Sequence, residues 1–368
     1  MLSRLPANAP AWLDRLSAWL APFEVCFAHV AQRGAFRRYL LGLLSDSRRK
    51  SMSAMLERVH DAGTYQAFQH FITDAPWSAE AVWRHLRATL PDRAGVLILD
   101  GTSFPKQGAH SVGVAHQYCG ALGKLANCQT AVTVALWTGA RAWVLGATLY
   151  LPEAWLTAAQ RARARIPASV QGQPKWQLAL TLLRQVRASG ITVTAVLGDA
   201  EFGESATLRR ALHRAGLPYA LGVSSRLKVF LGTPPVVRPA PSTGIGRPRT
   251  RPTLASGVTA VDARTWAAAQ PARAWRLVSW RNGTQPAWRA RFCATRVTPA
   301  HDWRERRLAP EVWLLCERAL GGGDRTKYYL VHLPATASLR TLVRLTHQRW
   351  AIEQQYRELK DELVLDHF

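Results

Sequence analysis

The chain has 368 residues, of which 48% are hydrophobic and 20% charged, and its 48 Lys and Arg against 24 Asp and Glu give a formal net charge of +24. This composition excludes a disordered chain and is typical of a folded protein of two or three domains. Because such a positive surplus is self-repulsive unless a polyanion offsets it, nucleic acid is the favoured partner and an acidic membrane surface the second choice.

The sequence predicts neither a membrane protein nor a disulfide-linked one. No stretch approaches the roughly 20 apolar residues that span a bilayer, and residues 1–16 lack the regions of a signal peptide. The five cysteines are odd in number and scattered, and no Cys-x-x-Cys pair supports a zinc site. We therefore expect an intracellular, cytoplasmic protein.

Residues 1–90 are expected to form a helical domain, because their apolar residues recur at helical spacing. Phe36, Leu40 and Leu43 illustrate the pattern, and a further helix is predicted over 79–90. The basic run at 48–50 makes DNA binding one interpretation of this domain. A packing or dimerisation role is the other, and no helix-turn-helix spacing decides between them.

Residues 91–225 predict a mixed α/β sheet. Apolar or alternating runs predict strands at 94–100, 112–118, 130–137, 142–151, 191–199 and 218–223. Amphipathic helices are expected over 175–188 and after Gly203. The alternation of strands and helices is the basis for the α/β prediction.

Residues 226–325 interrupt this pattern and predict an inserted β-rich subdomain. It begins with a Pro- and Arg-rich connection at 234–252 and continues with short Trp-rich strands near 275–280, 288–292 and 312–316. Residues 326–368 then return to the core, with a strand at 328–333 and one long helix from Ser338 to about Leu363.

Two apolar strands each end in an aspartate, Asp100 in one case and Asp199 in the other. Taken alone, Asp100 is well explained as the cap of a turn at Gly101–Thr102. If the two strands are neighbours in one sheet, however, the carboxylates converge at one edge and require a cation. Hard oxygen ligands favour Mg²⁺, with Mn²⁺ able to substitute.

The last predicted helix offers a third acid, Glu353. Arg349 and Lys360 lie four residues before it and seven after it, on the same helical face. The face could bind metal through the carboxylate and phosphate through the cations, or it could be a solvated helix with an ordinary ion pair. A third carboxylate would complete a site for two metal ions, of the kind used in displacement at phosphorus.

The segments LDGTS around Asp100, GDAEFG around Asp199 and RWAIEQQYRELK around Glu353 resemble the catalytic segments of bacterial DDE transposases. The similarity is closest to insertion-sequence transposases of the 701 type, within the insertion-sequence 4 superfamily, and includes QHFITDAPW and QYCGALGKLANCQTAV. The resemblance implies a ribonuclease-H-like core and a catalytic, metal-binding triad of Asp100, Asp199 and Glu353. It also implies that Arg349 and Lys360 bind DNA. Thr346 stands where the superfamily signature has Tyr.

The implied activity is metal-dependent cleavage of DNA at the ends of an insertion sequence, followed by strand transfer. Double-stranded DNA, namely terminal inverted repeats and target, would be the partner, bound by a homodimer in the bacterial nucleoid. Lys106 and Lys124 are further candidate DNA contacts, or else ordinary surface lysines. The chain stops soon after LVLDHF, where the family usually continues. The alternatives are therefore a truncated transposase that only binds DNA, and a ribonuclease-H-like metal nuclease without strand transfer.

The tryptophans of the 226–325 segment have two interpretations. Trp275, Trp280, Trp288 and Trp313 could stack on an exposed base. More often, Trp at strand spacing belongs to the core because of the area it buries. The motif GRPRTRP at 246–252 resembles a minor-groove-binding arm, or is a linker.

Overall fold

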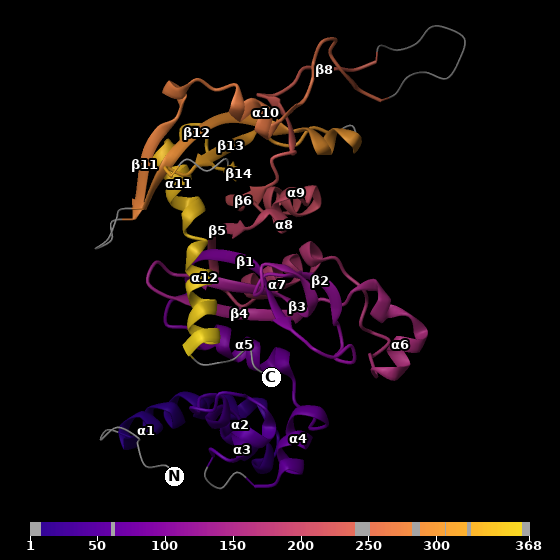
Figure 1. Ribbon diagram of the computed structural model, residues 1–368, viewed down its shortest axis with the longest axis vertical. Coiled ribbons are helices and arrows are strands. Elements are labelled where there is room, and N and C mark those ends of the chain that lie inside the picture. The colour runs from indigo at the N-terminus through magenta and orange to yellow at the C-terminus, as the bar shows by residue number, and fades with distance from the viewer. Residues whose placement is uncertain are drawn as a thin grey trace. The chain divides into compact units, whose positions relative to one another are not determined.

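The computed structural model describes residues 9–59, 63–239, 251–281, 288–305, 307–321 and 325–362. The chain forms two compact units: one contains Met1–Arg93, Ala188–Ile191 and Ile352–Phe368, and the other contains Ala94–Arg187 and Thr192–Ala351. The first unit is mostly helical and the second is built on a large mixed sheet (Figure 1). The expected mixed α/β class is confirmed.

The first unit consists of short helices around an aromatic core. Its N-terminal elements are α1 (Ala9–Leu20), the 3-10 helix η1 (Ala21–Cys26), α2 (Val30–Leu43), α3 (Met52–Leu56), α4 (Tyr65–Thr73) and α5 (Ala79–Thr89). A Ser or Thr side chain caps each of α3, α4 and α5 by accepting the amide hydrogen of the third helical residue. The core cluster contains Leu20, Phe23, Phe27, Ala35, Phe36 and Phe71, with Trp77 packed against it.

The basic run at 48–50 does not present three charges to solvent. Lys50 is buried, and its ammonium donates to the Ser45 carbonyl at 2.6 Å, so it closes the turn between α2 and α3. Only Arg48 and Arg49 are exposed. The interpretation of this run as a basic corner is therefore weakened, because one of its three cations has a structural role.

The second unit contains a sheet of twelve strands in the order β10-β7-β12-β13-β14-β6-β5-β1-β3-β2, with β11 beside β12 and β4 beside β3. Its strands β1 and β5 are parallel, as are β5 and β6, and the other pairs between named strands are antiparallel. The strands are β1 (Ala94–Pro105), β2 (Ala115–Cys119), β3 (Lys124–Trp137), β4 (Ala142–Leu149), β5 (Thr192–Gly198), β6 (Tyr219–Val223), β7 (Lys228–Leu231), β10 (Val261–Asp262), β11 (Arg276–Arg281), β12 (Trp288–Pro299), β13 (Val312–Arg318) and β14 (Thr326–His332).

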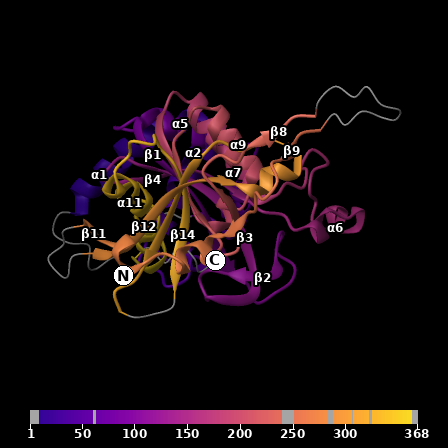
Figure 2. The ribbon, with the colours of Figure 1, turned by 90° about the horizontal axis from the view of Figure 1, so that it is seen from above.

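The strands of residues 226–325 extend the same sheet through β13 and β14. A separate pair, β8 (Val236–Val237) and β9 (Thr253–Leu254), projects from the rest of the unit (Figure 2). Residues 240–250, which hold most of the GRPRTRP motif, lie outside the described residues. The boundaries at 90, 225 and 325 remain predictions.

Strand β1 lies inside the sheet, between β5 and β3, and its apolar run is buried as expected: Leu97, Ile98 and Leu99 have no exposed surface. The expectation that this strand ends at Asp100 is wrong. Gly101 and Thr102 are paired with β3, and β1 continues to Pro105. Asp100 therefore does not cap a turn at Gly101–Thr102. Strand β3 pairs with β1 from Val96 to Pro105, whereas the parallel partner β5 pairs with β1 only as far as Leu99.

Helices and short 3-10 helices connect the strands of this unit. They are η2 (Glu153–Leu156), α6 (Ala158–Arg163), α7 (Lys175–Ala188), α8 (Ala200–Gly203), α9 (Ala206–Arg214), α10 (Ala263–Ala268), η3 (Ala272–Ala274), η4 (Ala300–Glu305) and α11 (Leu339–His347). Helix α7 has the predicted bounds and buries Ala179, Leu182, Leu183 and Val186.

The single long helix expected from Ser338 is instead three segments. Helix α11 ends at His347, α12 runs over Trp350–Arg357, and a π-helical segment, η5, covers Glu358–Glu362. The break at Gln348 and Arg349 lies between two tertiary contacts, a stack on His347 and a hydrogen bond from Arg349. Local periodicity could not predict it, because those partners come from distant strands.

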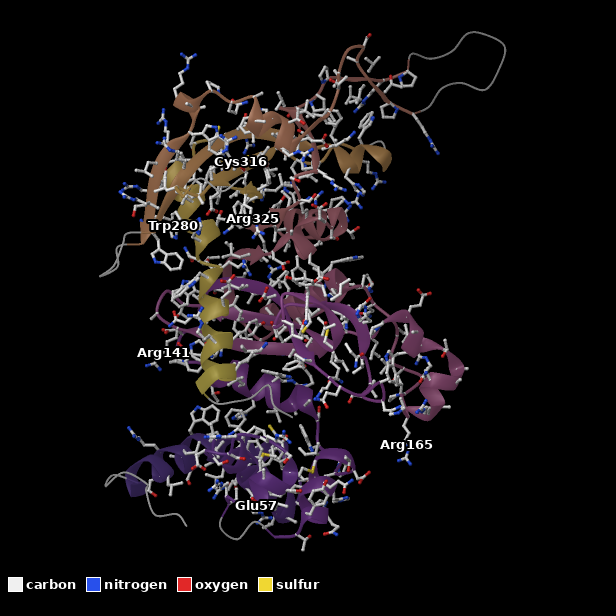
Figure 3. The ribbon with its side chains drawn as sticks, viewed as in Figure 1. Glu57, Arg141, Arg165, Trp280, Cys316 and Arg325 are labelled. Carbon is white, nitrogen blue, oxygen red and sulfur yellow. The ribbon has the colours of Figure 1, made fainter. Side chains whose placement is uncertain are left out.

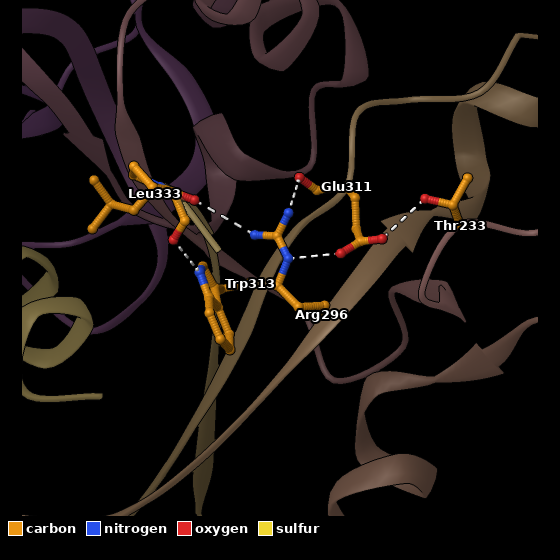
Figure 4. A network of polar contacts seen from close by, with 6 residues as sticks. Thr233, Arg296, Glu311, Trp313 and Leu333 are labelled. Carbon is orange, nitrogen blue, oxygen red and sulfur yellow. Dashed lines mark hydrogen bonds and ion pairs between the residues drawn. The ribbon is translucent and has the colours of Figure 1, made fainter. Parts of the chain in front are cut away.

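A polar network ties the ends of β12 and β13 together (Figure 4). The Arg296 guanidinium donates from Nε to the Glu311 carboxylate at 2.7 Å and from Nη2 to the Glu311 carbonyl at 2.8 Å. Thr233 donates to the second carboxylate oxygen at 2.9 Å. These hydrogen bonds hold the pKa of Glu311 below its ordinary value, so the carboxylate stays charged.

Among the described helices, none is both long and apolar enough to cross a bilayer.

Candidate active site

Asp100 lies inside the buried centre of the sheet. Its side chain is only 12% exposed, and Thr133 of β3 donates a hydrogen bond to its carbonyl at 3.2 Å. Side chains alternate along a strand, so Asp100 and Thr102 point to the same face of β1. The Thr102 hydroxyl is also buried and makes no hydrogen bond. A buried hydroxyl without a hydrogen bond, on the same face as a buried carboxylate, leaves an oxygen that a ligand on this face could use.

Asp199 follows β5 directly and caps the short helix α8. Its Oδ1 accepts the amide hydrogen of Glu201 at 2.9 Å, which fixes the carboxylate at the turn. Leu99 is paired with Gly198 across β1 and β5, so Asp100 and Asp199 occupy the next positions on two adjacent parallel strands. The sequence predicted this neighbourhood, although only one of the two strands ends there.

Two glycines allow α8 to pack closely against β6. This packing fixes the position of the turn that contains Asp199, the residue that caps α8. A Cβ atom on Gly203 would lie 1.7 Å from the Gly222 carbonyl oxygen, and one on Gly222 would lie 2.9 Å from the Ala200 amide nitrogen. Both positions therefore require glycine. The turn that holds Asp199 rests directly on the backbone of β6.

Arg349 reaches this corner from the break between α11 and α12. Its Nη1 donates to Oδ1 of Asp100 at 3.3 Å, although the two residues are 249 positions apart. Two residues earlier, His347 stacks on Trp280 with ring centroids 3.8 Å apart. Figure 3 shows Trp280 beside the C-terminal helical segment. His347 also lies 3.5 Å from the buried carboxylate of Glu317. These contacts anchor the segment that carries Arg349.

Sequence reasoning missed a second ion pair, which lies on the face of β1 opposite the Asp100 side chain. Lys175, the first residue of α7, lies 2.6 Å from Oε1 of Glu201. The other oxygen, Oε2, is 3.6 Å from the position that a Cβ atom on Gly101 would occupy, so Glu201 lies beside the residue that follows Asp100. Glu201 stands in the GDAEFG segment and could have been noticed there. Lys175 has no local signal, because only the tertiary fold brings α7 to Glu201.

The remaining predicted site residues are more dispersed. Lys106 is half-buried just after β1, and its amide donates to the Asn127 carbonyl at 2.9 Å. Lys124 is exposed at the start of β3. Glu353 and Lys360 belong to the first compact unit, where Glu353 is exposed on α12 and the Lys360 ammonium lies 5.9 Å from the Tyr356 ring centroid. The structure brings together Asp100, Asp199 and Arg349, all of the second unit.

The donors at this corner suit a hard divalent cation. Carboxylate and hydroxyl oxygens are the ligands that Mg²⁺ and Mn²⁺ prefer, and Asp100, Asp199 and Thr102 supply them. Within the described part of the chain, no group of three or more His, Cys, Asp and Glu is close enough to hold a metal ion. The corner thus offers two acidic ligands, and a complete site requires another.

The four tryptophans of the 226–325 segment differ in burial. Trp275 is 5% exposed and packs under the Arg318 guanidinium, which lies 3.8 Å from its ring, so it belongs to the core. Trp280 and Trp313 are half-buried. Trp288 is 41% exposed and meets the rings of Trp280 and Trp350 edge to face. Only Trp288 retains a large free surface.

Comparison with known proteins places the chain in a family. A family model described as DDE superfamily endonuclease matches residues 22–287. No curated protein matches the chain. Among solved structures, the chain is similar to a cryo-EM structure of the piggyBac transposase synaptic complex with hairpin DNA, with 10% identity and a TM-score of 0.42. The match covers 89% of this chain and 59% of that one, so the chain spans less than two thirds of the length of that transposase.

Proposed function

The chain belongs to the DDE superfamily of endonucleases, and from this premise we propose that it is a transposase that cuts DNA at the ends of an insertion sequence and joins them to target DNA. The observation that carries the proposal is the position of the two aspartates: Asp100 on β1 and Asp199 directly after β5 each follow the last residue pair, Leu99 and Gly198, of two adjacent parallel strands. The relationship to insertion-sequence transposases of the 701 type is part of this proposal and rests on the sequence segments.

A ribonuclease-H-like core is supported by part of the strand order. Strands β4, β3, β1, β5 and β6 are consecutive neighbours, the first three antiparallel and the last three parallel. In parallel α/β layers, ligands bind beyond the carboxyl ends of the strands. Asp199 lies at such an end, and Asp100 lies where the parallel pairing stops.

Asp100, Asp199 and Glu353 would hold Mg²⁺ or Mn²⁺, and two such ions, when bound, supply an activated nucleophile and stabilise the leaving oxygen. The protein's own residues orient the reaction. The turn capped by Asp199 fixes one carboxylate through the Glu201 amide, and burial limits water around the other. Arg349, held beside Asp100, would contact a phosphate of the DNA backbone, as would Lys360, Lys106 and Lys124.

Double-stranded DNA is the proposed partner, because the net charge of +24 favours a polyanion. Binding by a homodimer and a DNA-binding role for residues 1–90 belong to the same proposal and rest on the sequence resemblance. Affinity for DNA should fall steeply with salt as counterions are released less favourably. A flat salt dependence would contradict the phosphate contacts.

The decisive experiment incubates the protein with labelled terminal-repeat DNA and Mg²⁺ or Mn²⁺ and follows both cleaved and joined products. Asp100→Asn and Asp199→Asn should abolish cleavage while DNA binding persists; full activity in either variant would refute the assignment. Glu353→Gln should also be inactive, with Glu358→Gln as its control. Binding without cleavage would favour a protein that only occupies DNA, and cleavage without joining would favour a nuclease.

A further inference from the structure

The break between α11 and α12 is flanked on both sides by aromatic contacts. On one side, the His347 ring lies on the Trp280 ring with an angle of 13° between the two planes. On the other side, Trp350 begins α12 and meets Trp288 edge to face, with ring centroids 5.6 Å apart. Arg349 therefore has a packed aromatic residue two positions before it and another directly after it.

The rings that contact this break come from the β11–β12 strand pair. Trp280 belongs to β11 and Trp288 is the first residue of β12, and the two strands are antiparallel. Their indole rings meet edge to face, with centroids 6.5 Å apart. Phe292, further along β12, meets both Trp280 and His347 edge to face, at 5.6 Å and 5.8 Å. The strand pair thus presents three connected rings to the segment that carries Arg349.

A buried carboxylate on the next strand contacts the same imidazole. The Glu317 side chain of β13 is only 9% exposed, and its Oε2 lies 3.5 Å from Nε2 of His347. The Tyr329 hydroxyl donates to the same carboxylate oxygen at 2.9 Å. Because an aromatic stack and a buried polar group both contact one ring, His347 can occupy few positions. The end of α11 is therefore fixed to the sheet before the chain reaches Arg349.

The position of Arg349 depends on these contacts because no continuous helix passes through it. Residues 348 and 349 form a turn between α11 and α12, so packing sets the direction of the chain there. The Arg349 hydrogen bond to Asp100 is 3.3 Å long, which exceeds the usual N–H···O distance. A long guanidinium side chain also loses much conformational entropy when it is fixed. Groups that fix the backbone of Arg349 therefore help to keep the guanidinium beside Asp100.

The partial burial of Trp288 allows two roles. Trp288 is 41% exposed, so its free surface could stack on a base of DNA. Its described ring contacts are with Trp280 and Trp350, and edge-to-face pairs have a preferred geometry that orients both partners. A tryptophan that only stacks on a base needs no contact with the residue that follows Arg349. The contact with Trp350 therefore favours a positioning role.

We propose that Trp280 and Trp288 are positioning residues that hold Arg349 beside Asp100, so that the β11–β12 pair aligns the guanidinium with a DNA phosphate. This inference rests on the proposed function, because it assumes that Arg349 contacts a phosphate. It gives the Trp-rich strands a role at the site without a contact between these rings and DNA. All the residues involved belong to the second compact unit.

The test measures the affinity of the full chain for labelled terminal-repeat DNA at several salt concentrations, without Mg²⁺ so that no cleavage occurs. Each phosphate contact contributes about 0.9 to the slope of log affinity against log salt concentration, whereas a stacked base releases no counterion. Arg349→Ala should therefore lower the slope by about 0.9. The double variant Trp280→Leu/Trp288→Ala should lower it by about the same amount, because Arg349 leaves the phosphate. Adding Arg349→Ala to that double variant should lower it no further.

Single variants keep the test decisive if the double variant unfolds. Trp288→Ala changes an exposed ring and should remain folded by circular dichroism, and its smaller loss of slope should disappear in an Arg349→Ala background. Trp288→Phe keeps an aromatic ring beside Trp350 and should keep the wild-type slope. Trp266→Ala is the matched control, because Trp266 of α10 is also partly buried but its ring meets no other aromatic ring among the described residues. It should leave the slope unchanged.

The outcomes separate the inference from the proposed function. If Arg349→Ala leaves the slope unchanged, the proposed phosphate contact is wrong and the inference fails with it. If Arg349→Ala lowers the slope but the tryptophan variants do not, or if their effects add to that of Arg349→Ala, the proposed function stands and the inference alone is overturned. Weaker binding by Trp288→Ala at every salt concentration, with an unchanged slope, would also overturn it and assign Trp288 to base stacking.

Discussion

The close approach of α8 to β6 leads to a specific prediction for Gly222. A Cβ atom there would lie 2.9 Å from the Ala200 amide nitrogen, 3.1 Å from the Asp199 carbonyl carbon and 3.4 Å from the Asp199 Cα. Ordinary van der Waals contact requires about 3.5 Å. All three atoms are backbone, so the strain in Gly222→Ala can be relieved only if the Asp199 turn moves away from β6 by several tenths of an ångström.

The expected cost has two parts. Overpacking a tight contact destabilises a fold by about 1–3 kcal/mol. Displacement of a catalytic group by as little as about 1 Å can reduce the rate 100-fold. We therefore expect Gly222→Ala to remain folded, to lose roughly 10-fold or more in DNA cleavage, and to keep its DNA affinity, because the phosphate-contacting residues are not displaced.

The assay compares cleavage rate, DNA affinity and urea unfolding for Gly222→Ala and Gly120→Ala. Gly120 is the matched control, because no atom lies within 4 Å of the position of its Cβ and its φ does not require glycine. Gly203→Ala, whose Cβ would lie 1.7 Å from a carbonyl oxygen, should be far less stable than either. Wild-type cleavage and stability in Gly222→Ala would refute the claim that β6 positions Asp199.

Three further predictions concern the core, the polar network and the helix break. Leu99→Ala removes a fully buried side chain of β1 and should cost about 2–5 kcal/mol of unfolding free energy in urea titrations, whereas Leu277→Ala, at a position 53% exposed, should stay within about 0.5 kcal/mol of the wild type. The lowered pKa of Glu311 means that its contribution to stability is present above the ordinary carboxyl pKa and is lost as the pH falls through the lowered pKa of the folded state. Glu311→Gln should accordingly be less stable than the wild type at neutral pH, with a difference that shrinks in acid; a difference independent of pH would contradict this account. Arg349→Ala should reduce DNA cleavage at least 10-fold and flatten the salt dependence of DNA binding by about one phosphate contact, as measured by titration at several salt concentrations; an unchanged slope would exclude that contact.

Much of the fold could be predicted from periodicity. The bounds of α7 were predicted from its amphipathic pattern, and the burial of Leu97–Leu99 followed from an uninterrupted apolar run. These features can be predicted because they depend on residues close in sequence: the spacing of apolar side chains along a segment indicates whether it forms a helix or a strand.

The residue pattern alone indicates that two apolar runs each end in an aspartate, within a strongly basic chain. That β1 continues past Asp100 depends on the fold, because the length of the strand is set by pairing with β3. The fold also decides that the C-terminal helix breaks at Arg349, 249 residues from the Asp100 carboxylate that this side chain contacts. Lys175 and Glu201 became neighbours for the same reason: their separation depends on how α7 and α8 are placed around the sheet, which no local pattern encodes.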